Sequence, residues 1–472
     1  MLASALVSWV DGGGGTGALL LSAVITGLVG EAMLTGSEAS TRADAGIAFA
    51  SVAWSWLAVS VAGALPYLLG GVFSWAHADD ALFESISGFT CTGSSVIANL
   101  DRVPAGLLFF RSMTHWFGGM GLIVLAVAVL PALKVGGLEL VASEAPGPTA
   151  DQLTPRVAET ARRLWVLYGA VTAVVTIALL AAGLSPFDAV THSFATVATG
   201  GFSPHGESIA FFDSFAVELI IVLGMLYCAA NFSLHWQAVT TGPSAYRRIS
   251  EFRWYLWLIF GSFGLLLALN LGQLDLVENL RESLFYTVSI GTSTGFVSSD
   301  YALWVPAAQI TLITLMVVGG MSGSTAGGIK VLRLQMMVRY AVREVIRARH
   351  PSAVSSMRIG DRVIPEQVAA RAIGFVLLYI GLIVVGGVVV TALGTDLLTG
   401  FAGAASAIGN TGPALGDAGP HSTFLAFPRP ARGVLMALMM FGRLELFPSL
   451  LMFVAGTRAV SRASRQRRLR RA

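Results

Sequence analysis

The sequence predicts an all-α membrane protein in which four pseudosymmetric repeats, each a helix, a re-entrant pore loop and a second helix, surround one central axis. Three observations support this prediction. The 472 residues are 55% hydrophobic and 12% charged, with a mean hydropathy of +0.72, which is too apolar for an ordinary soluble domain. Apolar runs near the ~20 residues that cross a bilayer recur along the chain. A Thr-Gly pair recurs four times between these runs.

The composition also argues against several other classes of protein. Cys91 and Cys228 are isolated from each other and from histidine, so neither a disulfide framework nor a zinc site is indicated. The seven histidines are scattered, and no HExxH motif is present. An intramembrane enzyme is a rival class, but it would need a nucleophile with a partnering histidine, and none is evident. The small net charge of +3 gives no reason to expect nucleic-acid binding.

The apolar runs predict membrane spans in the following order: 15–36, 46–70, 106–131, 160–184, 214–240, 252–272, 304–346, 367–393 and 431–457. The first run has the length of a span rather than of a cleaved signal. The run 304–346 is too long for one simple span. Because "GGMSGSTAGGIK" at 319–330 interrupts it with glycines and small polar residues, we expect a broken helix there.

Basic residues gather in alternate connections, which predicts the orientation of the chain. The clusters are 156–163, 247–253, 330–371 and the tail 458–471. By the positive-inside rule they face the cytoplasm, together with the C-terminus, and the four Thr-Gly segments open to the outside. The arginines at 339–349 are equally suited to anionic lipid head groups and to a docking partner.

Successive Thr-Gly glycines lie about 100 residues apart, a period that indicates repeated units. The predicted division of the chain is a further membrane segment at 1–45, four repeats at 46–131, 132–240, 241–350 and 351–457, and a basic tail at 458–472. The second repeat includes a cytoplasmic linker, and the third contains the broken helix.

Each Thr-Gly segment has the composition of a cation-binding loop. An acid upstream (Asp80, Asp188, Glu282 or Asp396) is expected to start a short helix whose negative end points inward. Backbone carbonyls at membrane depth can replace the hydration shell of a cation, glycine permits the required dihedral angles, and threonine adds a hydroxyl. The alternative is four ordinary polar turns. The predicted filter residues are Thr92, Gly93, Thr199, Gly200, Thr294, Gly295, Thr411 and Gly412, with Cys91, Ala198, Ser293 and Asn410 before them.

Three further motifs carry a family resemblance. "FRSMTHWFGGMGLIVLAVAVLP" (110–131), "GGMSGSTAGGIKV" (319–331) and "FGRLELFP" (441–448), in register with the four loops, closely resemble the Trk/Ktr/HKT superfamily of potassium transporters. The linker "SEAPGPTADQLTPRVAETA" is similar to the Trk type. The resemblance extends from about residue 15 to the end of the chain. Trk proteins have two helices before the first repeat, whereas here only a stub precedes the span at 15–36.

The resemblance implies potassium uptake across a bacterial cytoplasmic membrane by a homodimer with one potassium pathway per subunit. It matches the filter glycines to Gly93, Gly200, Gly295 and Gly412, and Cys91 puts fine selectivity in question. It also implies a cytoplasmic, TrkA-like regulatory ring that binds NAD or ATP, so that this chain needs potassium ions but no organic cofactor. The alternatives are a sodium-permeable transporter and an ion-coupled (Na⁺ or H⁺ symport) transporter.

The gate is predicted from the broken helix and from one intramembrane arginine. Loop 319–330 suits a movable constriction, and the alternative is a simple helix kink. Arg443 lies well inside the last apolar run, near the membrane centre, where an arginine normally faces a cavity or a partner. The alternative is a structural contact with Glu445 or a carbonyl. The predicted gate residues are Gly319, Gly320, Gly323, Ser324, Thr325, Gly327, Gly328, Lys330, which should anchor the loop near the cytoplasmic face, and Arg443.

Overall fold

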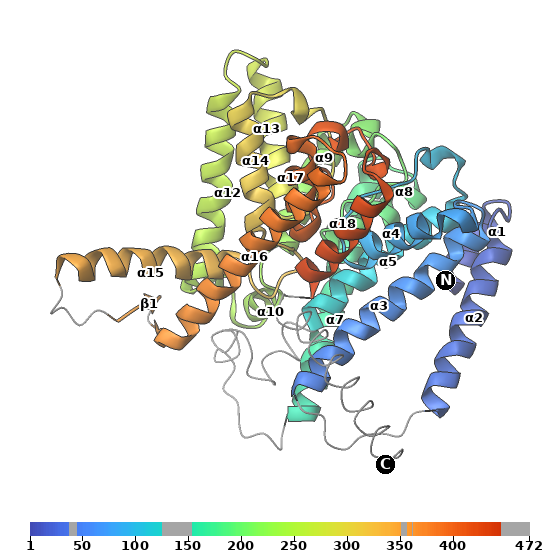
Figure 1. Cartoon of the computed structure of the whole chain (residues 1–472), viewed down its shortest axis with the longest axis horizontal. Coiled ribbons are helices and arrows are strands. Elements are labelled where there is room, and N and C mark those ends of the chain that lie inside the picture. Colours follow the sequence, from blue (N-terminus) through green and yellow to red (C-terminus); the bar gives the residue numbers. More distant parts are fainter. Residues whose placement is uncertain (37–44, 125–152, 351–355, 361, 445–472) are drawn as a thin grey trace.

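In the computed structural model, the structure describes residues 1–36, 45–124, 153–350, 356–360 and 362–444, and these are mostly helical (Figure 1). The strands in this part of the chain are β1 (Arg358–Ile359) and β2 (Arg362–Val363), an antiparallel pair with Arg358 opposite Val363. Five of the described helices are long and apolar enough to cross a membrane, or six if one bent pair counts as a span. The predicted class, a helical membrane protein, is therefore confirmed at the level of secondary structure.

The chain begins with two helices, α1 (Leu2–Val10) and α2 (Thr16–Thr35). The predicted stub before the first full span is thus a short helix. α1 packs closely on α5 (Ala105–Val124), since a β-carbon on Gly106 would lie 2.3 Å from the β-carbon of Ser8. The two helices flank the first repeat at one side of the molecule (Figure 1).

Four units of long helix, short helix, loop and second helix follow. The long first helices are α3 (Ala45–Leu69), α7 (Leu153–Ala181), α12 (Ser250–Leu269) and α16 (Glu366–Ala392). The short helices, called pore helices below, are α4 (Ala78–Phe89), α8 (Pro186–Val197), α13 (Leu276–Gly291) and α17 (Leu397–Gly409). The second helices are α5, α9 (Phe215–Cys228) with α10 (Phe232–Thr241), α14 (Pro306–Val318) with α15 (Val331–Arg349), and α18 (Arg429–Arg443).

Shorter elements connect these helices. α11 (Ser244–Arg248) leads into α12. Turns of 3₁₀ helix occur at Trp75–His77, Leu100–Arg102, Ser208–Phe212, Tyr301–Leu303, Gly416–Ala418 and Phe424–Ala426. All but the first of these follow a pore helix, so the chain returns from each pore loop through a compact turn rather than a second pore helix.

The pore helices begin largely as predicted. Asp80 and Asp188 lie in the first turns of α4 and α8, and Asp396 caps α17 by accepting a hydrogen bond from the Thr399 amide at 3.0 Å. Glu282 was the wrong residue for α13, because this helix begins at Leu276 after Asp275 and Glu282 lies within it. The third pore helix is therefore longer than the prediction from Glu282 implied.

Two of the second helices are broken, although the sequence predicted only one break. Loop 319–330 separates α14 from α15, as expected. The run 214–240, predicted as one span, is bent by 93° between α9 and α10, so that prediction was wrong. Asn231 starts the new helix because its side chain accepts a hydrogen bond from the Leu234 amide at 3.0 Å.

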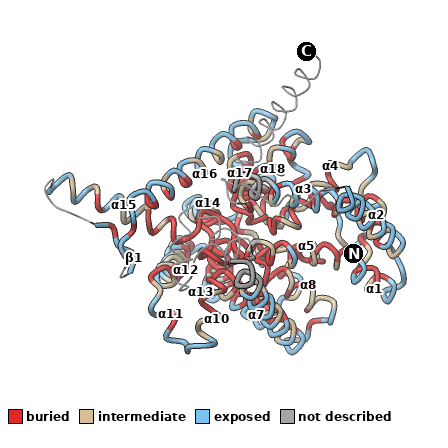
Figure 2. The backbone as a smooth tube through the Cα atoms, turned by 90° about the horizontal axis from the view of Figure 1, so that it is seen from below, coloured by how far each residue is buried: buried red, intermediate tan, exposed pale blue. Residues whose placement is uncertain are grey.

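Burial divides the molecule into a centre and a surround. The inner ends of the pore helices and the loops that follow them are buried, whereas the long helices have many exposed residues on the outside (Figure 2). Trp257 on α12 and Leu377 on α16 are examples, 78% and 66% exposed. Exposed apolar faces of this kind suit contact with lipid, so the bilayer surrounds a polar central axis.

Candidate functional site

The four loops that follow the pore helices share one backbone conformation. Each turns at a residue other than glycine with a φ of 52° or 53°, namely Cys91, Thr199, Ser293 and Asn410. Two residues later each loop has a glycine with positive φ, namely Gly93 (85°), Gly201 (78°), Gly295 (77°) and Gly412 (103°). Left-handed residues are uncommon outside glycine, so four of them at matching positions indicate a constrained, repeated structure. We call residues 90–93, 198–201, 292–295 and 409–412 pore loops 1 to 4.

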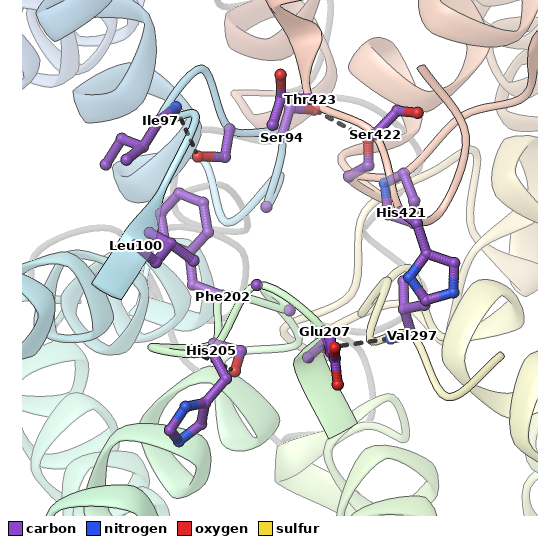
Figure 3. A pocket seen from close by; sticks show the side chains of 18 of the residues that line it. Ser94, Ile97, Leu100, Phe202, His205, Glu207, Val297, His421, Ser422 and Thr423 are labelled. Carbon is purple, nitrogen blue, oxygen red and sulfur yellow. Dashed lines mark hydrogen bonds between the residues drawn. The ribbon is translucent and has the colours of Figure 1, made fainter. Parts of the chain in front are cut away.

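The pore loops close into a ring through these glycines. A β-carbon on each glycine would collide with a carbonyl oxygen of the next loop. The closest approaches are Gly93 to Gly200 O (2.3 Å), Gly201 to Thr294 O (2.1 Å), Gly295 to Thr411 O (1.7 Å) and Gly412 to Thr92 O (2.7 Å). The four contacts run from loop 1 to 2, 2 to 3, 3 to 4 and 4 back to 1, so the loops surround a single opening (Figure 3).

The ring corrects the register predicted for the second loop. The sequence paired Gly200 with Gly93, but the structure places Gly201 at that position and Gly200 at the position of Thr92. Likewise Thr199, rather than Ala198, occupies the position of Cys91. Relative to the left-handed residue of each loop, the Thr-Gly pair of this repeat therefore lies one residue earlier than the other three pairs.

Hydroxyl contacts within two of the loops, and one amide between two loops, hold the loops in place. The hydroxyls of Thr90 and Thr92 are 2.7 Å apart, as are those of Thr292 and Thr294. Asn410 Nδ2 donates to Thr92 Oγ1 at 3.0 Å, which ties loop 4 to loop 1. These side chains are fully buried. The loops are thus held by polar contacts that leave little freedom for the backbone.

An open cavity of about 520 Å³ lies directly outside the ring. All four pore loops contribute to its floor through Gly93, Gly201, Gly295 and Gly412, and Glu207, His205 and His421 lie around its wall (Figure 3). The cavity is open to solvent, so ions in solution have access to the ring.

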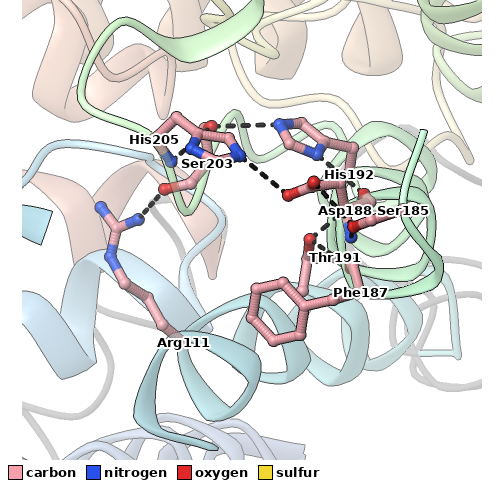
Figure 4. Close-up of polar contacts among 8 residues, drawn as sticks. All are labelled: Arg111, Ser185, Phe187, Asp188, Thr191, His192, Ser203 and His205. Atoms are coloured by element: carbon pink, nitrogen blue, oxygen red, sulfur yellow. Dashed lines mark hydrogen bonds and ion pairs between the residues drawn. The ribbon is translucent and has the colours of Figure 1, made fainter. Parts of the chain in front are cut away.

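A buried ion pair supports the wall of this cavity. Arg111 Nε donates to Glu84 Oε1 at 2.7 Å, and its Nη1 donates to the Ser203 carbonyl at 2.8 Å, just beyond pore loop 2 (Figure 4). Glu84 also accepts from Ser95 Oγ and the Val96 amide, which follow pore loop 1. The sequence analysis did not single out Arg111 or Glu84, although a charged residue inside an apolar run was a usable signal.

A histidine network continues this support toward the outer surface. His192 contacts Ser203 Oγ through Nε2 at 3.0 Å, and His205 Nε2 lies 2.8 Å from Asp188 Oδ1 (Figure 4). Asp188 belongs to the first turn of α8, so the network joins the start of the second pore helix to the chain that leaves its loop. We assign these histidines no role in chemistry.

We expect the Glu84→Gln protein to be less stable than the wild type by about 3 to 5 kcal/mol, because the Arg111 charge would remain buried without its carboxylate. Melting temperatures in detergent measure this effect. The control is Asp79→Asn, which removes a half-exposed partner 3.5 Å from Arg429 and should cost below about 1 kcal/mol. Equal melting temperatures for the two variants would contradict the supporting role of Glu84.

On the other side of the ring, loop 319–330 lies against the pore loops. All of its residues are buried. The Gly327 amide donates to Ser293 Oγ of pore loop 3 at 2.6 Å, and a β-carbon on Gly327 would lie 2.2 Å from the Gly409 carbonyl of pore loop 4. Most of the predicted gate residues therefore form one continuous segment directly beneath the ring.

Loop 319–330 is fastened to the bend between α9 and α10. The hydrogen bonds are Met321 N to Ala229 O (2.9 Å), Asn231 Nδ2 to Ser322 O (2.7 Å), Phe232 N to Gly323 O (3.1 Å) and Thr325 Oγ1 to Cys228 O (3.1 Å). Lys330, predicted to anchor the loop near the cytoplasmic face, is buried and donates to the Ala326 carbonyl of its own loop. The loop is thus packed on all sides by protein.

Arg443 meets the same loop. It ends α18, its side chain is 1% exposed, and its Nη1 donates to the Thr325 carbonyl at 2.7 Å. Its Nε and Nη2 have no hydrogen-bond partner within the described residues. Glu445, the other partner considered from the sequence, lies outside the described residues. The structure therefore brings together Arg443 and loop 319–330, which the sequence had connected only by hypothesis.

Comparisons with known proteins agree with this architecture. A family model described as TrkH, cation transport protein, matches residues 19–458. The chain is 40% identical over 411 residues to the Trk system potassium uptake protein TrkH of Vibrio parahaemolyticus, covering 86% of this chain and 84% of that protein. The protein of the same name from Escherichia coli K12 is 38% identical with the same coverage. The crystal structure of the potassium transporter TrkH from V. parahaemolyticus matches with a TM-score of 0.87 and 35% identity, over 96% of this chain and 94% of that one.

Proposed function

This chain belongs to the TrkH family of cation transport proteins, and from that membership we propose that it takes up potassium ions across the cytoplasmic membrane of a bacterium. The observation that carries the proposal is the closed ring of four pore loops, each contacting the next through a positive-φ glycine. Such a ring offers the backbone carbonyls that a dehydrated cation requires. The two relatives named above carry potassium uptake in their names.

The orientation of the pore helices supports selection of cations over anions. All four run toward the ring and end there, at Phe89, Val197, Gly291 and Gly409. The C-terminal end of a helix carries a partial negative charge. Four such ends around one opening favour a cation at the ring, and the residues that coordinate it belong to pore loops 1 to 4, including Thr92, Gly200, Thr294 and Thr411.

Loop 319–330 and Arg443 form the gate in this proposal. The loop obstructs the path below the ring sterically, and the Arg443 guanidinium adds a positive charge beside it. Opening requires the loop to leave its contacts with pore loops 3 and 4. The glycines of the loop allow such a change because several of them already have unusual dihedral angles, among them Gly319, Gly323 and Gly328.

The proposed assembly is a homodimer with a cytoplasmic, nucleotide-binding regulatory ring of the TrkA kind. Arginines on α15 and around α11 provide basic surfaces for that ring on the cytoplasmic side, and the chain ends on this side too. α15 extends sideways from the helical bundle, which makes it accessible to a partner (Figure 1). The basic tail 458–472 lies outside the described residues.

Purified protein in liposomes tests the proposed function. We expect potassium flux that exceeds sodium flux by about tenfold or more and that needs neither a sodium nor a proton gradient. The regulatory subunit with nucleotide should increase that flux. Comparable sodium flux would favour the sodium-permeable alternative, flux that depends on a second gradient would favour symport, and protein without ion flux would refute the proposal.

A further inference from the structure

Pore loop 2 differs from the other three at one position. The residue before the positive-φ glycine is Thr92 in loop 1, Thr294 in loop 3 and Thr411 in loop 4, and each of these side chains is fully buried. In loop 2 this residue is Gly200. Its φ does not lie in the left-handed region, so the backbone itself does not require a glycine there.

The space behind Gly200 is occupied by a side chain from another helix. A β-carbon on Gly200 would lie 2.3 Å from Nδ1, 2.6 Å from Cγ and 2.7 Å from Cε1 of His115. The imidazole therefore occupies the volume into which a threonine at this position would project. This explains why position 200 is a glycine although its dihedral angles would accept other residues.

The imidazole is held firmly in that position. His115 is fully buried on α5, and its ring stacks on Phe202 with centroids 4.0 Å apart and an interplanar angle of 12°. Arg111, one turn earlier on α5, places its guanidinium carbon 3.4 Å from the centre of the same Phe202 ring. Phe202 directly follows pore loop 2, so α5 packs against this end of the loop through the side chains of His115 and Arg111.

In pore loops 1 and 3, the threonine side chain braces its own loop, whereas the Thr411 hydroxyl of pore loop 4 has no hydrogen-bond partner within the described residues. The hydroxyls of Thr92 and Thr294 contact those of Thr90 and Thr292, at the ends of their own pore helices. Gly200 has no side chain to do this, yet its carbonyl takes part in the ring beside Gly93. Some other group must fill the space, or the loop could relax away from the axis.

We propose that His115 is a positioning residue of the ion filter, whose imidazole replaces the missing side chain at Gly200 and holds the Gly200 carbonyl in the ring. The inference rests on the proposed function, because it concerns discrimination between potassium and sodium. His115 acts through the loop and does not contact the ion.

A double-mutant cycle in liposomes tests this role. We expect His115→Ala, which leaves a void, and Gly200→Thr, which collides with the imidazole, each to lower the potassium-to-sodium flux ratio by about tenfold. The double variant His115→Ala/Gly200→Thr returns the threonine arrangement of the other loops. Its ratio should recover to within about threefold of the wild type, because the two changes compensate. The control His350→Ala, at the exposed end of α15, should leave the ratio unchanged.

A conservative variant separates positioning from general stability. His115→Gln keeps a planar side chain of similar size and should preserve the flux ratio, whereas His115→Ala should not. Monodispersity on size exclusion shows which variants are folded. If folded His115→Gln loses selectivity as fully as His115→Ala, or if the losses of the two single variants simply multiply in the double variant, the role of His115 is overturned. Wild-type liposomes without potassium flux would overturn the proposed function and this inference with it, whereas selective wild-type flux combined with either of those variant results would overturn this inference alone.

Discussion

Replacing Gly295 by alanine is expected to abolish selective potassium uptake. The added β-carbon would lie 1.7 Å from the Thr411 carbonyl and 2.6 Å from Pro413 Cδ, so pore loops 3 and 4 must separate. The residue also has a φ of 77°, which costs a side chain roughly 1 to 3 kcal/mol. Paired potassium and sodium fluxes in liposomes measure the loss, which should reach at least about tenfold in the ratio.

The matched control is Gly261→Ala. Gly261 lies inside α12, no atom lies within 4 Å of its would-be β-carbon, and its φ is ordinary. Alanine there should leave flux unchanged. At the other ring glycines, the loss of selectivity caused by alanine should be larger where the added β-carbon lies closer to a carbonyl oxygen. Gly412 should be the most tolerant, because its nearest carbonyl oxygen is 2.7 Å away. Wild-type selectivity in folded Gly295→Ala protein would contradict the assignment of the ring as the ion filter.

The second large effect concerns the gate. Neutralising Arg443 to glutamine should raise potassium flux about a hundredfold. A cation about 6 Å from the guanidinium meets a repulsion of roughly 3 kcal/mol at an effective dielectric constant near 20, and about 1.4 kcal/mol corresponds to tenfold in rate. The shorter glutamine also weakens the hold on the Thr325 carbonyl. Deleting Gly323 to Ala326 should raise flux further, because it removes part of the steric barrier.

The charge control for this experiment is Arg358→Gln on the exposed strand β1, which changes net charge equally but lies outside the loop. It should leave flux at the wild-type value. If flux falls or stays constant in folded Arg443→Gln protein and in the deletion variant, then Arg443 and the loop serve structure rather than gating.

The repeat architecture could be predicted because it depends on local sequence features. Apolar runs, acids before short helices and the Thr-Gly pairs each depend on a few neighbouring residues. Asp80 and Asp188 accordingly lie in the first turns of their helices, Asp396 caps its own helix, and loop 319–330 breaks its helix at glycines. The predicted roles in filtering and gating remain predictions that the experiments above address.

What the sequence did not reveal depends on contacts between distant segments. The register of pore loop 2 was missed because it depends on a long-range contact. The side chain of His115, from another repeat, occupies the space that a side chain at position 200 would need. The bend after α9 was missed because "CAAN" contains neither glycine nor proline. There Asn231 caps a new helix, and carbonyls released by the bend bind loop 319–330 instead.

The bend between α9 and α10 has a thermodynamic consequence for the resting protein. It gives the second repeat four hydrogen bonds to a loop of the third. At about 0.5 to 1.5 kcal/mol each, they favour the closed position of the proposed gate by roughly 2 to 6 kcal/mol. The open form would then make up at most about one molecule in thirty. A partner can raise this population only by its preference for the open form, so one that binds both forms equally, however tightly, would leave the pathway shut.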